Sequence, residues 1–206
     1  MITVKTLVLG ALYNNTYIIK DEPTGALAVV DPACNSQKLS DAINELGGDL
    51  QYILLTHGHF DHIGGVQFLR DRFDTKVAVG EDELILINDE FLNGSRIHHL
   101  DVNKVDVDLA LSDGEVLKLG ETEFKYIKTP GHTVGGGCYV FDDCIFTGDT
   151  LFCQSIGRTD FPTSDPVEMM ASLEKLSALD GDYIVYPGHD VYSTLENERK
   201  YNPYMR

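Results

Sequence analysis

Five of the seven histidines follow short apolar runs and lie among glycine, threonine or proline, a context that suits metal binding. The strongest signal is the segment THGHFDH at 56–62. His57 and His59 are alternate residues of a loop expected to be extended, so one ion could bind both imidazoles, and Asp61 and His62 would point to a neighbouring position. This donor set suits zinc first, with iron or manganese as alternatives. The alternative to a metal site is a polar loop whose histidines are hydrogen-bonded. That alternative would be favoured for one isolated histidine, but not for this segment with three histidines and a carboxylate.

Three distant motifs supply the remaining candidate ligands. A glycine precedes each of them, as it precedes His59, and allows the backbone to turn sharply at the end of a strand. The motifs are TPGHT at 129–133 with His132, FTGDT at 146–150 with Asp149, and YPGH at 186–189 with His189.

Asp149 is predicted to bridge two cations, because a carboxylate has two oxygens and the neighbouring imidazoles cannot bridge in this way. Each site keeps room for water, which is typical of a catalytic metal and not of a structural one. The sequence thus predicts one site of His57, His59, His132 and Asp149, and a second of Asp61, His62, His189 and Asp149.

Composition narrows the possible partners. The formal net charge of -17, without a basic cluster, disfavours nucleic acid and anionic membrane surfaces, so a small-molecule substrate is expected. The four cysteines form no CxxC pair, and we expect reduced thiols in a cytoplasmic protein. The apolar run at 7–12 is too short to span a bilayer and predicts a strand. The sequence does not indicate the oligomeric state.

The elements that must position these ligands follow from apolar runs and stop signals, within one expected domain over 1–206. Sheets covered by helices on both outer faces are expected, and 81–113 is the least defined stretch, with helical character at 81–87 and a loop holding His98 and His99. Strands are predicted at about 2–9, 16–20, 26–31, 52–55, 77–80, 115–119, 122–128, 137–141, 144–147 and 183–186. Helices are predicted at 36–46, from His62 with Val66, Phe68 and Leu69 inward, and at 166–178 with Val167, Met170, Leu173 and Leu176 inward.

Taken in order, THGHFDH, TPGHT, FTGDTLF and YPGH resemble the metallo-β-lactamase superfamily over nearly the whole chain. The run GDTLF followed by GRTDFP is similar to the glyoxalase II-like hydrolases, especially their short single-domain type. The resemblance implies an α/β fold, the αββα sandwich, with two metal ions at one edge between the sheets. It also implies that the seven ligands carry over, since every position is filled.

The expected reaction is hydrolysis of a thioester, similar to S-lactoylglutathione, by a metal-bound hydroxide. Asp61 is predicted to hold this hydroxide and move its proton, and the sequence has no GxSxG nucleophile elbow. Arg158 matches a glutathione-contacting residue of glyoxalase II, with a structural salt bridge as the equal alternative. Asp160, Val191 and Gly136 replace aromatic or histidine residues of that family, and its C-terminal helical domain is missing, which weakens glutathione as the thiol.

Three other functions remain open at this point. An iron-dependent persulfide dioxygenase has the same histidine pattern, and a lactonase has the same fold. A non-catalytic protein stabilised by metal is the third, but structural zinc sites are usually closed and rich in cysteine. Asp31, just after a strand, is a candidate partner of a metal-binding histidine, although a turn residue before Pro32 is the favoured interpretation.

Overall fold

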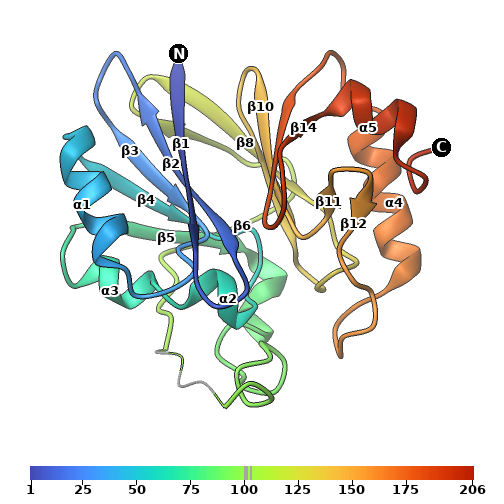
Figure 1. The fold of residues 1–206 in the computed structure, drawn as a ribbon, viewed down its shortest axis with the longest axis horizontal. Coiled ribbons are helices and arrows are strands. Elements are labelled where there is room, and N and C mark those ends of the chain that lie inside the picture. The colour runs from blue at the N-terminus through green and yellow to red at the C-terminus, as the bar shows by residue number, and fades with distance from the viewer. Residues whose placement is uncertain (100–101, 103) are drawn as a thin grey trace.

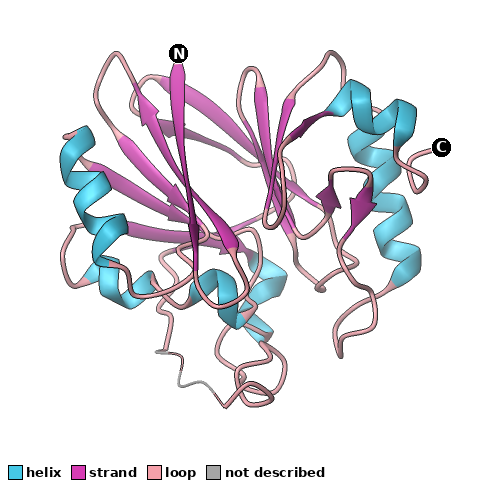
Figure 2. Ribbon diagram, in the orientation of Figure 1, coloured by secondary structure: helices cyan, strands magenta, loops and turns pink. Residues whose placement is uncertain are grey.

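Two β-sheets face each other, and helices cover the outer side of each sheet (Figure 1, Figure 2). The computed structural model describes residues 1–99, 102 and 104–206. The first sheet has the order β1 (Ile2–Leu9), β2 (Asn14–Asp21), β3 (Leu27–Val30), β4 (Leu50–Leu54), β5 (Lys76–Gly80) and β6 (Leu109–Leu111). The second has the order β14 (Ser193–Thr194), β13 (Ile184–Pro187), β10 (Cys144–Gly148), β9 (Gly137–Val140), β8 (Thr122–Lys128) and β7 (Val116–Leu119). This is the predicted αββα sandwich, and the fold prediction is confirmed.

The helices divide between the two outer faces. On the first sheet lie α1 (Gln37–Leu46), α2 (Phe60–Ile63) and α3 (Val66–Arg70), followed along the chain by the 3-10 helix η1 (Glu81–Ile85) (Figure 1). Beside the second sheet lie α4 (Pro166–Ser177), α5 (Leu195–Tyr201) and a small hairpin of β11 (Leu151–Phe152) and β12 (Ser155–Ile156).

Strand direction brings the ligand-bearing loops to one edge. The β3, β4, β5 and β6 strands run parallel, and β10 is parallel to β13 in the second sheet. The segments that follow parallel strands emerge on the same side of a sheet, which is where open α/β folds place their sites. The loops after β3, β4, β10 and β13 therefore meet at one edge of the sandwich.

The core has three layers because the strands are buried on both faces. In β2, Ile18 packs with the α1 side of the first sheet, whereas Tyr17 and Ile19 pack between the sheets. The third layer joins the second sheet to α4 through Met169, Leu173 and neighbouring residues. Alternate side chains of one strand thus support both sides of the first sheet.

The sequence-based boundaries need correction around the glycine pair 64–65. The predicted helix at His62 begins earlier, at Phe60, and is broken into α2 and α3. The Gly65 N–H donates to Pro32 O at 2.6 Å, and a Cβ at Gly64 would lie 2.6 Å from Ala33 O. The chain is pressed against the loop after β3 and cannot continue as one regular helix. Phe68, expected inside, is only half-buried.

The inward face of α4 was predicted correctly at Leu173 and Leu176, which are buried, but not at its N-terminal end. Val167 and Met170, predicted to point inward, are 76% and 42% exposed. Met169 is buried in their place, so the apolar face of the first two turns is rotated relative to the prediction. Within the segment at 81–87 the structure has a 3-10 helix of five residues, Glu81–Ile85. The sequence did not predict β6, β11, β12, β14 or α5.

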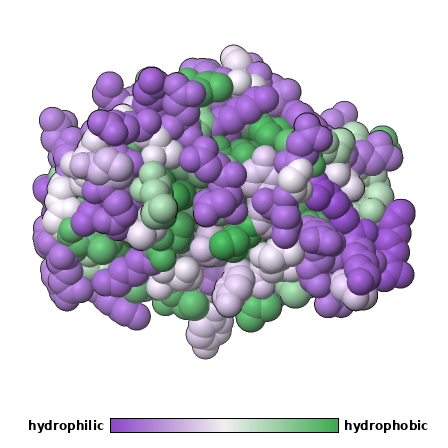
Figure 3. All heavy atoms as spheres, turned by 90° about the horizontal axis from the view of Figure 1, so that it is seen from above, coloured by the Kyte–Doolittle hydropathy of each residue, from purple (hydrophilic) through white to green (hydrophobic). Residues whose placement is uncertain are grey.

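No helix in the described part of the chain has the length and apolar character that a bilayer-spanning helix requires. The surface seen from the end at which β1 starts is mostly hydrophilic, with hydrophobic residues in small separate groups (Figure 3). Such scattered apolar residues are normal on a protein surface and indicate no binding site by themselves.

The Tyr139 hydroxyl links the two sheets, and its removal tests their packing. From β9 it donates to Leu55 O at 2.9 Å and lies 3.2 Å from Ala78 O, and the side chain is fully buried. Tyr139→Phe removes the donor and should lower the free energy of unfolding by about 1–2 kcal/mol. Urea denaturation at fixed metal content measures this effect. Tyr204→Phe, at an exposed tyrosine, is the control and should change stability little; equal effects of the two variants would contradict the inter-sheet role.

Candidate metal centre

All seven predicted ligands come together at the edge between the sheets. His57 to His62 follow β4, His132 lies in the loop between β8 and β9, and Asp149 and His189 follow β10 and β13. Two of these loops need glycine: Gly131 has φ +135° and Gly148 has φ +48°, conformations that other residues rarely adopt. A Cβ at Gly131 would lie 2.4 Å from the backbone nitrogen of Met169, so the His132 loop is held directly against α4.

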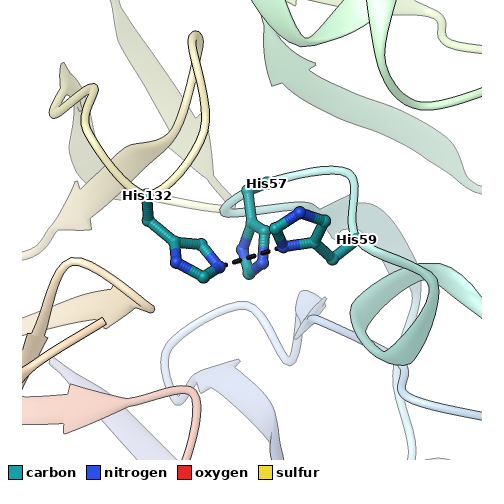
Figure 4. A group of neighbouring side chains, drawn as sticks. All are labelled: His57, His59 and His132. Carbon is teal, nitrogen blue, oxygen red and sulfur yellow. Dashed lines mark hydrogen bonds between the residues drawn. The ribbon is translucent and has the colours of Figure 1, made fainter. Parts of the chain in front are cut away.

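His57, His59 and His132 form the first cluster (Figure 4). Each offers a nitrogen within 4.8 Å of the others, and the Nδ1 of His59 lies 2.9 Å from the Nε2 of His132. Phe161 closes one side, because its ring meets the edges of His59 and His132 with centroids 5.0 Å and 5.5 Å apart. Three buried imidazoles converging on one point can hold a borderline divalent cation.

Asp61, His62 and His189 form the second cluster. The Oδ2 of Asp61 lies 3.7 Å from the Nε2 of His62 and 3.5 Å from the Nε2 of His189. This mixed set of imidazole and carboxylate donors also suits zinc, iron or manganese.

Asp149 lies between the two clusters. Its Oδ2 is 3.4 Å from the Nε2 of His132 and 3.7 Å from the Nε2 of His189, and its Oδ1 is 3.5 Å from the Nε2 of His62. One carboxylate therefore faces ligand nitrogens from both clusters. This is the arrangement that the predicted bridging role requires.

Unpartnered atoms show that these residues fit a metal. Among the described residues, the Nε2 atoms of His57 and His62 and the Oδ1 of Asp149 are buried and have no hydrogen-bond partner. Buried polar groups are nearly always hydrogen-bonded, so three exceptions in one place need an explanation. Each atom can donate a lone pair to a cation.

Asp31 orients the imidazoles of His57 and His62. From the sequence alone, this role is less favoured than that of a simple turn residue. Its Oδ2 lies 2.9 Å from the Nδ1 of His62 and accepts from Thr56 Oγ1 at 2.6 Å, while its Oδ1 accepts from the Thr56 N–H at 2.8 Å. Thr56 Oγ1 in turn lies 3.1 Å from the Nδ1 of His57. A hydrogen bond at Nδ1 leaves Nε2 free for a metal. Asp31 also has φ +48°, so it turns the chain as expected and holds two histidines as well.

Asn14, at the start of β2, was missed from the sequence. The fully buried side chain donates to the Oδ2 of Asp61 at 2.9 Å, and its Nδ2 lies 3.5 Å from the Nε2 of His189. Its only sequence signal is its place at the end of a tight turn after a strand, which many asparagines share.

The clusters differ in their preferred protonation. Burial, assisted by the neighbouring imidazoles, lowers the pKa of His57 and His59, and burial likewise lowers the pKa of His132. For His62 and His189 burial acts in the same direction, but nearby carboxylates outweigh it and raise the pKa of both, that of His62 to about 10. The first cluster therefore binds protons weakly and the second cluster binds them strongly.

The carboxylate of Asp61 is held in its ionised form. Burial acts to raise its pKa, but the imidazoles of His62 and His189 and the amide of Asn14 outweigh this and place the pKa well below its usual range. Asp61 therefore offers a negatively charged oxygen at neutral pH.

Arg158 lies at the rim beside the first cluster. Its guanidinium forms two hydrogen bonds with Asp160, at 2.9 Å and 2.8 Å, and lies 4.5 Å from the centre of the Phe161 ring. Its backbone oxygen lies 2.8 Å from the Nδ1 of His132, so this residue orients a candidate ligand through its main chain. The predicted contact between the side chain and substrate stays a prediction. His98 and His99 are exposed, and the His98 ring lies 4.6 Å from that of Phe60.

The comparisons with known proteins place the chain in one family. The sequence profile described as the metallo-beta-lactamase superfamily matches residues 9–189. A hydroxyacylglutathione hydrolase, GloC, of Haemophilus influenzae is 33% identical, over 98% of this chain and 97% of its own length. A probable polyketide biosynthesis zinc-dependent hydrolase, PksB, of Bacillus subtilis is 32% identical, over 85% of this chain and 72% of its own length.

Solved structures agree with this assignment. The crystal structure of BLEG-1 B3 metallo-beta-lactamase superposes with a TM-score of 0.92 at 32% identity, covering 98% of this chain and 99% of that chain. TTHA1623 in a di-iron-bound form superposes with a TM-score of 0.86 at 32% identity, covering 98% of this chain and 100% of that chain.

The contrast in protonation predicts different pH dependence for two bound cations. A cation must displace the protons of His62 and His189, whose pKa values are raised, whereas His57, His59 and His132 are already neutral at pH 7. Affinity of the second cluster should rise with pH through the neutral range, by up to about tenfold per pH unit for each proton released, and that of the first should stay nearly constant. Chelator competition between pH 6 and 8 measures both slopes. Equal slopes would contradict this contrast.

Loss of Asp31 should weaken metal binding. Both carboxylate oxygens of Asp31 accept hydrogen bonds, whereas the side chain of Asp31→Asn has only one acceptor oxygen for Thr56 and His62. We therefore expect a loss of roughly 10–100-fold in metal affinity. Asp21→Asn is a matched control, since Asp21 is also fully buried and accepts hydrogen bonds from Thr24 and Thr122, but touches no ligand. Equal metal affinity of the two variants would show that Asp31 does not orient the imidazoles.

Proposed function

The chain belongs to the metallo-beta-lactamase superfamily, and we propose that it is a metal-dependent hydrolase of thioesters. The observation that carries this proposal is the pair of clusters facing a single carboxylate, Asp149. We assign His57, His59 and His132 to one cation, Asp61, His62 and His189 to another, and Asp149 to both. Zinc is the first choice, since the donors are imidazole and carboxylate and the similar protein PksB is described as zinc-dependent.

The chemistry follows from two cations held side by side. When bound, such a pair lowers the pKa of a shared water towards neutrality and polarises the carbonyl of an ester. Asp61 is the residue we assign to positioning that water, because its carboxylate is ionised and its Oδ2 is fixed by Asn14. The same carboxylate would accept a hydrogen bond from that water and pass its proton on, because its lowered pKa keeps it ionised.

The leaving group points to a thioester. We identify no separate general acid near the clusters among the residues that the structure describes. A thiolate departs without being protonated first, whereas an amine or alkoxide does not. The similarity to a hydroxyacylglutathione hydrolase over nearly the full length of both chains supports the same choice. Arg158 is our candidate for contact with an anionic part of the thiol, although Asp160 neutralises its charge in the structure.

An apolar cavity beside Asp61 indicates that the acyl group of the substrate is apolar. It has a volume of about 350 Å³, and its lining includes Leu12, Cys34, Phe60 and Asp61. None of the described residues that line it is a lysine or arginine. A cavity without cations favours the hydrocarbon part of a substrate over a carboxylate or phosphate. We therefore assign this cavity to the acyl chain and the Arg158 side to the thiol.

A second candidate function is oxidation of a thiol persulfide by an iron-loaded form of the protein. The similarity to TTHA1623, a structure described as di-iron-bound, supports iron as the metal that this function requires. The donors of the two clusters and Asp149 are imidazoles and carboxylates, which can bind iron as well as zinc. Oxygen uptake with glutathione persulfide by iron-loaded protein would separate this function from hydrolysis.

The experiment compares thioesters of different acyl chains on protein of known metal content. Straight-chain acyl thioesters of N-acetylcysteamine, S-lactoylglutathione, a lactone and a penicillin are tested together. We expect thioester hydrolysis to dominate, with kcat/KM rising several-fold per added methylene until the cavity is filled. Cys34→Phe should shorten the preferred chain, whereas Cys153→Phe, which lines no part of the cavity, should leave the preference unchanged. Faster cleavage of the lactone or the penicillin would overturn the thioester assignment, and a flat chain-length profile would overturn only the acyl cavity.

A further inference from the structure

Glu83 is a buried carboxylate that joins two of the loops at the metal centre. It lies in η1, directly after β5, and its side chain is fully buried. Its Oε2 accepts a hydrogen bond from the Gly58 N–H at 2.7 Å, and its Oε1 accepts one from the Gly135 N–H at 2.8 Å. One side chain therefore holds two loops that are far apart in the sequence.

These two loops carry the whole first cluster. Gly58 lies between His57 and His59, and Gly135 lies three residues after His132. The two hydrogen bonds of Glu83 therefore act on the backbone between His57 and His59 and on the loop that carries His132. The second cluster has no such contact with Glu83 among the described residues.

The contact between η1 and the loops leaves little room for adjustment. A Cβ at Gly58 would lie 2.7 Å from Leu86 Cδ2 and 3.1 Å from Ile87 Cα, and a Cβ at Gly135 would lie 2.4 Å from the backbone nitrogen of Glu83. Glycine is thus required where each loop touches the 81–87 segment. Such close packing transmits small shifts because protein interiors are dense.

The environment of Glu83 is unfavourable for a charge. Burial raises the pKa of its carboxyl group, and none of the ion pairs found among the described residues includes Glu83. A buried carboxylate without a cationic partner costs folding free energy unless hydrogen bonds compensate for it. The two backbone N–H groups are its compensation, which ties the carboxylate to this pair of loops.

We propose that Glu83 is a positioning residue that sets the separation between the His57–His59 loop and the His132 loop, and so determines the metal affinity of the first cluster. The proposal rests on the assignment of the first cluster to a cation made above. It gives a role to the start of the 81–113 segment, which the sequence left without one.

Glutamine is the informative substitution at this position. A carboxylate has an acceptor oxygen for each N–H group, whereas the amide of Glu83→Gln has one oxygen and one NH2 group. The NH2 group would face either the Gly58 or the Gly135 N–H, donor against donor, so one of the two hydrogen bonds must be lost. The side chain keeps its size, so the main change is the loss of one hydrogen bond that fixes the separation between the two loops.

The test measures zinc binding to the full-length chain by chelator competition, without substrate. It is repeated in the background of His189→Ala, which disables the second cluster and assigns the remaining ion to the first. We expect Glu83→Gln to weaken binding at the first cluster by roughly 10–100-fold, the usual effect of losing an interaction that orients a ligand. Glu198→Gln is the matched control: Glu198 is equally buried and accepts from the Gln154 N–H at 2.7 Å and from the Ser193 hydroxyl, so it joins α5 to the β11–β12 turn and to β14 and not to a loop of the first cluster.

The outcomes separate positioning from general stabilisation. If thermal unfolding of both metal-free variants shifts alike, but only Glu83→Gln loses zinc affinity, the proposal holds. Wild-type affinity in Glu83→Gln, or an equal loss in Glu198→Gln, overturns it. Glu83→Asp, which is one methylene too short to reach both loops, is the second variant if the glutamine protein does not fold, and it should show the same loss. Absence of zinc binding in the unmodified chain would overturn this proposal and the proposed function together.

Discussion

The edge between the two sheets contains buried polar atoms that lack hydrogen-bond partners, and the arrangement of the surrounding loops depends on them. The Nε2 atoms of His57 and His62 and the Oδ1 of Asp149 are buried without a partner, at a cost of about 1–3 kcal/mol each. Asp31 contributes to this arrangement, because it holds the opposite nitrogen of His62 directly and that of His57 through Thr56. Two cations, one at each cluster with Asp149 facing both, would satisfy all three atoms.

Charge divides the centre into two unequal halves. The first cluster has only imidazoles and excludes protons through burial, while the second contains the carboxylate of Asp61 and attracts them. Asp149 faces both halves and can balance a positive charge in either. In a hydrolase this asymmetry has a use: the carboxylate side can hold water and its proton, and the imidazole side can polarise a carbonyl.

The sequence predicted correctly the elements whose structure depends on burial alone. It did not predict the features that depend on contacts between residues far apart in the chain. The longer strands were predictable because runs such as 27–30 and 53–55 are buried on both faces. The ligands were identified as candidates because histidine at strand ends is rarely a core residue. Asn14 and Glu83 were missed, since their partners lie 25 to 175 positions away and neither residue type is unusual at a turn or helix start. The break between α2 and α3 was missed for the same reason, because it comes from the loop after β3.

The most direct measurement of the central claim is a crystal structure of zinc-loaded protein with anomalous diffraction recorded on both sides of the zinc absorption edge. The account predicts two zinc peaks, one bound by the imidazoles of the first cluster and one by Asp61, His62 and His189. It further predicts that Asp149 lies between them with an oxygen towards each. A single zinc ion, or two ions without Asp149 between them, would contradict the account.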